Sequence, residues 1–143
     1  MRIDLKNIKV GYLISERIKE CDIDITRICD FFSCEEPEIE KMCQMDSLES
    51  DTLLKWCKLL KYDFFRLYTQ HLILYSPPAS RDKHINAKSD ILPTFRKNVY
   101  TKELISFVME QLNNGVMDTE QIIEEYRIPK TTLFKWLSKY KNF

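Results

Sequence analysis

The last seventeen residues of the chain carry four lysines and one arginine but no acidic residue, although the whole sequence is formally neutral. Ammonium and guanidinium groups bind phosphate, and short hydroxyl side chains hydrogen-bond to phosphates and base edges. The polar residues that could do this chemistry are Lys130, Thr131, Thr132, Lys135, Lys139 and Lys141. Their types and spacing indicate recognition of a polyanion, provided that one element presents them together.

A helix that starts at Pro129 would sort these side chains onto one face. Proline is tolerated in the first turn because its missing N–H has no intrahelical partner there. At about 100° per residue the apolar residues share one face: Leu133, Trp136, Leu137 and Tyr140. The opposite face holds Thr131, Lys135, Ser138 and Lys139. We therefore expect Trp136 in the core, and for Phe134 both packing and base stacking remain open.

Two further helices are expected before this one. Asp118 is a plausible N-cap for a helix through Tyr126. Thr101 can cap a helix through Leu112, which Asn113-Asn114-Gly115 would end. The C-terminal segment should thus form three helices with a tight turn before the last.

The stretch from Tyr100 to Tyr140 resembles the helix-turn-helix of bacterial insertion-sequence transposases and site-specific recombinases. The last helix of that family begins with a small residue, Ser/Thr, Leu, an aromatic residue, Lys/Arg and a second aromatic residue. The matching segment is Lys130-Thr-Thr-Leu-Phe-Lys-Trp136. The resemblance implies contacts of Thr131 and Lys135 with bases in the major groove. Lys130, Lys139 and Lys141 would lie nearer phosphates, and for each lysine the alternative is an ordinary solvated face.

The two halves of the chain differ in charge. Residues 1–75 hold eleven Lys/Arg and fourteen Asp/Glu, whereas residues 76–143 hold eleven and eight. This difference favours two modules. A hydrophobic content of 44% is sufficient for a core, and only two glycines argue against strand-and-turn architecture. We expect an all-α fold, with a repressor-like bundle in residues 1–75, a linker in 76–98 and a three-helix unit in 99–143.

Helical periodicity predicts five helices in the first module. Their apolar positions are, in chain order, Val10, Leu13, Ile14, Ile18 and Cys21; Ile25, Ile28, Cys29 and Phe32; Ile39, Met42 and Cys43; Leu53, Leu54, Cys57 and Leu60; and Phe64, Leu67, Tyr68, His71 and Leu74. Asp24 is the expected cap of the second helix. Five helices in so short a stretch form a bundle with short connections.

This arrangement, with Gly11-Tyr-Leu-Ile-Ser-Glu-Arg-Ile near the start and the stretch from Asp51 to Tyr68 at the end, resembles the five-helix phage-repressor-like (Xre) helix-turn-helix, especially a version common in Bacteroidetes. The third helix of those relatives opens with Ser/Thr, Arg and Asn. Here the same places hold Glu35, Glu36, Pro37 and Glu38, with Glu40 a turn later. Carboxylates are unsuited to a polyanion. We expect this helix either to be a solvated acidic helix start or to face a basic protein surface.

The segment from Ser76 to Asp90 is polar and proline-bearing, which is typical of a linker. Residues 91–98 are mildly apolar and then basic. Arg96 and Lys97 are either an arm that contacts DNA, as in minor-groove arms, or simply solvated.

Other chemistry is not indicated. The five cysteines are odd in number, lack C-x-x-C spacing and fall mostly at apolar helix positions, where small buried thiols are expected. His71 and His84 belong to no catalytic or metal motif. No strand pattern exists for a domain that could cut DNA, and no signal peptide or membrane span is found. We expect a cytoplasmic protein without cofactor or enzymatic activity.

The sequence therefore predicts a protein that binds double-stranded DNA specifically. It would be either a transcriptional regulator or a recognition protein associated with an element-encoded transposase. Homodimerisation is expected, through the N-terminal bundle. The competing hypothesis is an adaptor that docks a protein partner on the acidic bundle and binds no specific DNA.

Overall fold

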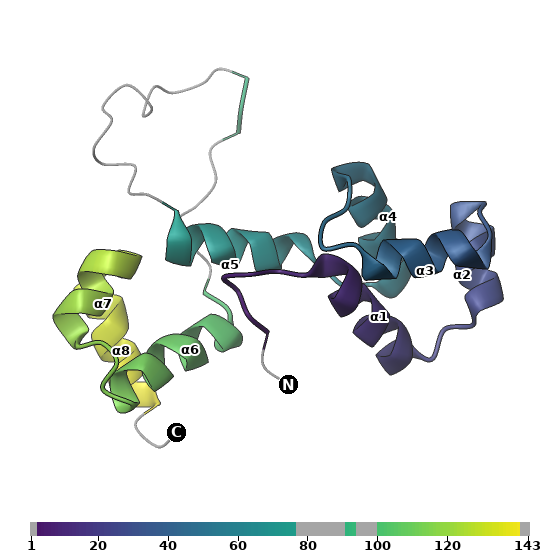
Figure 1. The fold of residues 1–143 in the computed structure, drawn as a ribbon. Helices are drawn as coiled ribbons and strands as arrows, with labels where there is room; N and C mark the ends of the chain where they lie inside the picture. Colours follow the sequence, from purple (N-terminus) through teal and green to yellow (C-terminus); the bar gives the residue numbers. More distant parts are fainter. Residues whose placement is uncertain (1–2, 77–90, 94–99, 141–143) are drawn as a thin grey trace. The chain divides into compact units, whose positions relative to one another are not determined.

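The computed structural model describes residues 3–76, 91–93 and 100–140, and every regular element within these ranges is an α-helix (Figure 1). The expected all-α fold class is confirmed. The helices are α1 (Val10–Cys21), α2 (Ile25–Phe32), α3 (Glu36–Gln44), α4 (Ser50–Leu60), α5 (Phe65–Tyr75), α6 (Lys102–Asn113), α7 (Thr119–Tyr126) and α8 (Lys130–Lys139). Arg96, Lys97, Lys141 and most of the expected linker lie outside the described residues.

The chain divides into two compact units, residues 1–69 and residues 70–143. The boundary lies inside α5, so the start of that helix groups with the N-terminal unit and its end with the C-terminal unit.

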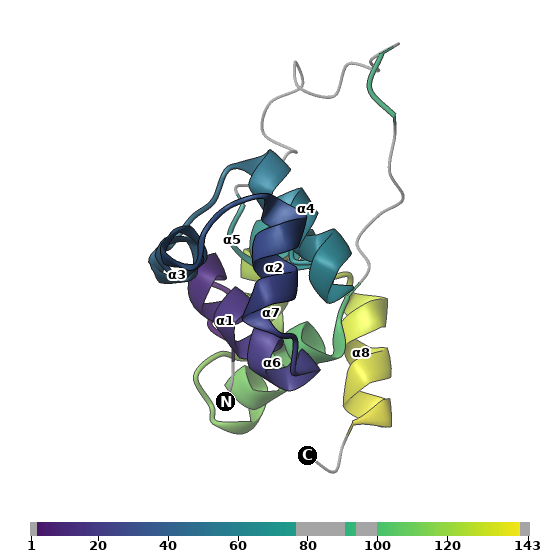
Figure 2. The same ribbon diagram turned by 90° about the vertical axis from the view of Figure 1, so that its right-hand side faces the viewer.

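In the N-terminal unit, α1 and α2 each pack on α3 and α4 (Figure 2). Most of the core comes from apolar positions that the periodicity of the sequence selects, but Leu54, one of these positions, is 45% exposed, whereas Leu59 and Trp56, which were not among them, are buried. Trp56 is fully buried, and its ring lies 4.5 Å from that of Phe32, centroid to centroid. The other fully buried side chains of this unit are Val10, Ile14, Ile28, Leu60 and Phe64.

The start of α1 makes backbone contact with the end of α3. The N–H of Val10 donates to the carbonyl oxygen of Asp46 (3.2 Å), and the N–H of Gly11 donates to that of Met45 (3.1 Å). A Cβ atom on Gly11 would meet backbone carbonyl oxygens of Met42, Cys43 and Met45 at under 3.0 Å. The two helices therefore approach so closely that only glycine fits.

In the C-terminal unit, α8 packs on α6 and α7. The side chains at its centre are Leu104, Val108, Ile122, Ile128, Leu133 and Trp136. The expected N-caps are confirmed: the Thr101 hydroxyl accepts from the N–H of Leu104, and Asp118 forms a reciprocal capping box with Gln121. In contrast, Asp24 occupies the N-cap position of α2 without a capping hydrogen bond.

Gln70, on the end of α5, is a buried polar side chain that fixes the start of α6. Its Oε1 accepts from the backbone N–H and from the hydroxyl of Thr101, each at 3.2 Å. We predict that Gln70→Leu lowers the free energy of unfolding of this unit by about 2 kcal/mol, because two part-buried donors of Thr101 lose their acceptor. Urea denaturation followed by the fluorescence of Trp136 measures this effect. Gln44→Leu makes the same chemical change at an exposed position of α3, in the N-terminal unit, and should change the free energy of unfolding read from the Trp136 transition by less than about 0.5 kcal/mol.

Candidate functional site

The candidate site is α8 together with the turn that precedes it. α7 ends at Tyr126, and α8 begins at Lys130, so three residues connect them. Arg127 adopts the left-handed conformation (φ 51°, ψ 35°), which turns the chain sharply. Ile128 is fully buried and anchors the turn in the core, and Pro129 is the N-cap of α8. The short turn and the buried Ile128 together fix the direction in which α8 leaves α7.

The inner face of α8 packs as the sequence predicts. Leu133 is fully buried, and Trp136 is 8% exposed. The Tyr100 ring meets the Trp136 ring edge-on, with the centroids 4.9 Å apart. Leu137 and Tyr140 are half-buried at the margin of this face. The expectation that Trp136 belongs to the core is confirmed, so its indole is not available to stack on bases.

The outer face of α8 brings most of the expected site residues together. Lys130, Thr131, Lys135 and Lys139 are exposed. Ser138, which was not among the expected contacts, is exposed on the same face. Thr132 is half-buried beside Leu133, so it presents less of its side chain than the other site residues.

The electrostatics of this face favour an anion. Within the described part of the chain, no carboxylate forms an ion pair with Lys130, Lys135 or Lys139. The first turn of α8 contains no acidic residue, and no described side chain caps its N-terminus. The positive end of the helix dipole and the ammonium group of Lys130 thus lie at the same end of α8, whereas Lys139 lies in its last turn.

Phe134 is the residue of α8 whose role the sequence left open. It is 47% exposed and lies on the outer face, where the Lys130 Nζ is 5.8 Å from its ring centroid. The helical spacing could not decide this, because position 134 lies near the border between the two faces.

The N-terminal unit contains a second pair of helices with the same connection. α2 and α3 are also joined by three residues, and the first of them, Ser33, is left-handed (φ 53°) like Arg127 (φ 51°). The local backbone of the two segments is therefore alike. Their side chains are not.

The second helix of this pair, α3, has an acidic and closed N-terminus. Glu35 and Glu38 form a capping box, in which the Glu35 N–H donates to Oε2 of Glu38 at 3.1 Å. Glu36, Glu38 and Glu40 are exposed, and Pro37 occupies the first turn. The N-cap residue of α8, Pro129, has no N–H that could make the equivalent bond, and no acidic residue lies in the first turn of α8. The two helix starts therefore differ in charge, acidic in α3 and basic in α8.

The described residues offer little for other chemistry. No group of three or more His, Cys, Asp or Glu side chains in residues 3–76, 91–93 and 100–140 could hold a metal ion. Most of the cysteines were expected to be buried, but all five are half-buried. Burial of the groups raises the pKa of the Cys29, Cys34 and Cys43 thiols above its ordinary value, which favours the unreactive protonated form.

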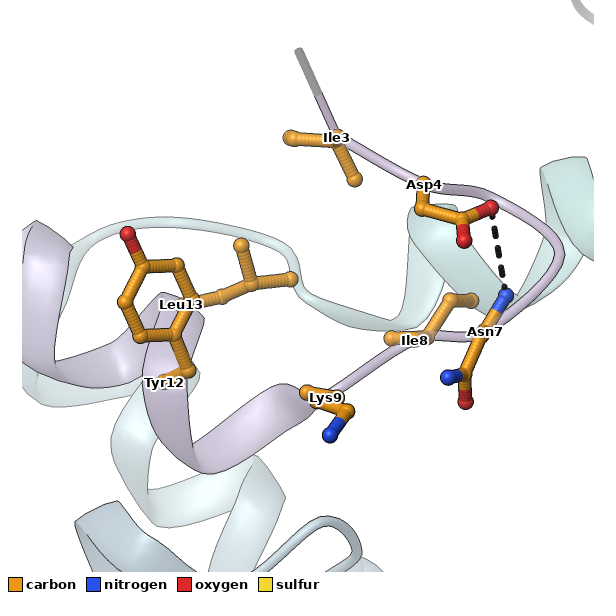
Figure 3. Close-up of a pocket in the computed structure, with 7 residues that line it drawn as sticks. All are labelled: Ile3, Asp4, Asn7, Ile8, Lys9, Tyr12 and Leu13. Carbon is orange, nitrogen blue, oxygen red and sulfur yellow. Dashed lines mark hydrogen bonds between the residues drawn. The ribbon is translucent and has the colours of Figure 1, made fainter. Parts of the chain in front are cut away.

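Figure 3 shows a shallow hollow beside the start of α1, with mixed polar and apolar walls. It is lined by Ile3, Asp4, Asn7, Ile8, Lys9, Tyr12 and Leu13. The Asp4 carboxylate accepts from the backbone N–H groups of Lys6 and Asn7, so it serves the local turn. None of the helices that are described has the length and apolar character needed to cross a membrane.

No protein-family model matches this chain, and no curated protein or solved structure is significantly similar to it.

Proposed function

We propose that the protein binds double-stranded DNA and reads the major groove with α8. The observation that carries this proposal is the composition of the outer face of α8: exposed lysines and short hydroxyl side chains without acidic residues or ion-pair partners in the described part of the chain. A helix fits the major groove, which is about 12 Å wide. The buried face of α8 leaves only this outer face to enter it.

The proposed roles follow from position along the helix. Thr131 and Lys135 lie one turn apart on the centre of the outer face, where base edges would be met. A lysine donates well to O6 and N7 of guanine, and a threonine hydroxyl can donate or accept. Lys130 and Lys139 lie at the two ends of the helix, where the phosphate backbones flank the groove. Thr132 would add a minor contact, and we propose phosphate contacts for Lys141, Arg96 and Lys97 from sequence alone.

The resemblance of residues 100–140 to transposase and recombinase helix-turn-helix units supports the same proposal. The protein would act in recognition without catalysis, either as a transcriptional regulator or beside an element-encoded transposase. Because α3 presents glutamates where a reading helix needs donors, we propose that the N-terminal unit provides dimer contacts and does not enter the groove. Two copies would then read two half-sites.

A salt series tests the proposal with the full-length chain. Affinity for a duplex should fall linearly with salt on a double logarithmic scale, with a slope of about −0.9 for each neutralised phosphate. The three contacts per copy from Lys130, Lys139 and Lys141 predict a slope of about −2.7 and a loss of about fortyfold between 50 and 200 mM salt, and the contacts proposed for Arg96 and Lys97 would make the slope steeper. Fluorescence anisotropy of a labelled duplex, chosen by selection from a random pool, measures the affinity at each salt concentration.

Two results would contradict the proposal. If the protein bound no duplex at low salt, the DNA-binding proposal would be wrong and the adaptor hypothesis would remain. A fragment of residues 1–75 that bound the selected duplex with full specificity would move the site from α8 to the N-terminal bundle.

A further inference from the structure

Phe134 is a large apolar side chain on a face that is otherwise polar. Trp136 on α8 packs on the inner face and Tyr140, the C-cap residue, is half-buried at its margin, whereas Phe134 remains 47% exposed. The core of the unit is filled by Leu133 and Trp136 from α8. Phe134 therefore offers apolar surface outward, on the face proposed to meet DNA.

The neighbours of Phe134 define what it could contact. It follows Thr131 by three residues, so both side chains lie on the same side of the helix. The Lys130 ammonium lies 5.8 Å from its ring centroid, on the N-terminal side. A phenylalanine neither donates nor accepts a conventional hydrogen bond. In the major groove the base edges present donors, acceptors and one large apolar group, the 5-methyl group of thymine.

We propose that Phe134 packs on a thymine methyl group and thereby requires an A·T pair at one position of the recognised site. Lys130 would hold the phosphate beside that pair, with its charge over the ring. This inference rests on the proposed function. It adds to that function a specificity determinant that depends on apolar contact and is therefore insensitive to salt.

Replacement of thymine by uracil tests the contact, because uracil lacks the methyl group and keeps the same hydrogen-bonding edge. The probe is the duplex that the full-length protein selects from a random pool, with its thymines changed to uracil one at a time. For the wild type, uracil at one position per half-site should weaken binding about fourfold, the factor expected for one buried methyl group. Uracil elsewhere should have little effect.

Variants of Phe134 assign the effect to this side chain. Phe134→Ala should bind the thymine duplex more weakly and should bind the thymine and uracil duplexes equally. Phe134→Leu should restore part of the preference for thymine. Ser138→Ala, the control on the same face, should keep the full thymine-to-uracil ratio. The fluorescence of Trp136 reports whether each variant is folded.

The outcomes separate this inference from the proposed function. If the wild type binds the duplex but uracil has no effect at any position, the thymine contact is wrong and DNA reading by α8 stands. The thymine contact is also wrong if Phe134→Ala keeps the wild-type ratio of affinities for the thymine and uracil duplexes. This result is expected if the Phe134 ring contacts a protein partner. If the wild type binds no duplex, the proposed function fails and this inference fails with it.

Discussion

Gly11→Ala is expected to destabilise the N-terminal unit by about 3 kcal/mol, although alanine is the better helix former. On helix propensity alone, the substitution inside α1 should stabilise the protein by roughly 0.5–1 kcal/mol. The added methyl group would, however, meet carbonyl oxygens of Met42, Cys43 and Met45 at under 3.0 Å. These are backbone atoms at the end of α3, and they cannot move aside as a flexible side chain would.

The cost has two physical origins. The methyl group would push α1 away from α3, and the hydrogen bonds from Val10 to Asp46 and from Gly11 to Met45 would lengthen with it. Apolar contacts between the two helices would loosen at the same time. Urea denaturation followed by the fluorescence of Trp56 reports this unit, and Trp136→Phe in both proteins removes the second tryptophan signal.

Gly115→Ala is the matched control. A Cβ atom there meets nothing within 4 Å, but the residue has a φ of +67°, which disfavours a side chain. It lies in the C-terminal unit, so it should leave the Trp56 transition of the N-terminal unit unchanged and cost its own unit about 1 kcal/mol, from backbone strain alone. If Gly11→Ala proved as stable as the wild type, the close approach of α1 and α3 would be wrong.

The local signals in the sequence were sufficient to predict the helices. Apolar residues at three- and four-residue spacing placed them, because helices in small bundles bury one stripe. Thr101 and Asp118 marked two helix starts correctly, since capping depends on a few neighbouring residues. The capping box of Glu35 and Glu38 was not expected, because glutamate is an uncommon N-cap residue.

Contacts between distant residues could not be read from periodicity. From the sequence alone, Gly11 is only a poor helix former. The need for glycine becomes visible when the carbonyl groups at the end of α3 are seen beside it. The residues Ser33 and Arg127 adopt a left-handed backbone conformation without being glycine, so the sequence does not predict these turns. The half-buried state of the cysteines likewise depends on which helices cover them, and the sequence overestimated their burial.

The candidate site was predictable in part. Helical spacing separated Thr131, Lys135 and Lys139 from the packing face, and the structure leaves all three exposed. Helical spacing could not decide whether the Phe134 side chain is buried or exposed, because this depends on how α6 and α7 cover α8.

Reversal of charge on α8 is expected to have the largest effect on binding. The triple variant Lys130→Glu, Lys135→Glu and Lys139→Glu should lose more than a hundredfold in affinity for the selected duplex, since one base contact is worth about 1–3 kcal/mol and phosphate contacts add to it. The three side chains are exposed and lack ion-pair partners within the described residues, so the unit should remain folded. Fluorescence anisotropy measures affinity, and circular dichroism verifies the helix content.

The control changes the net charge equally at exposed positions of other helices. It combines Lys55→Glu and Lys58→Glu on α4 with Lys102→Glu at the start of α6. Long-range repulsion of DNA by the protein's net charge is the same in both variants, and salt screens it beyond about 10 Å at 0.1 M. We therefore expect the control to lose less than about fivefold at that salt concentration, because only the α8 variant removes direct contacts. Equal losses in the two variants would mean that DNA is attracted to the protein's overall charge and that α8 is not the reading helix.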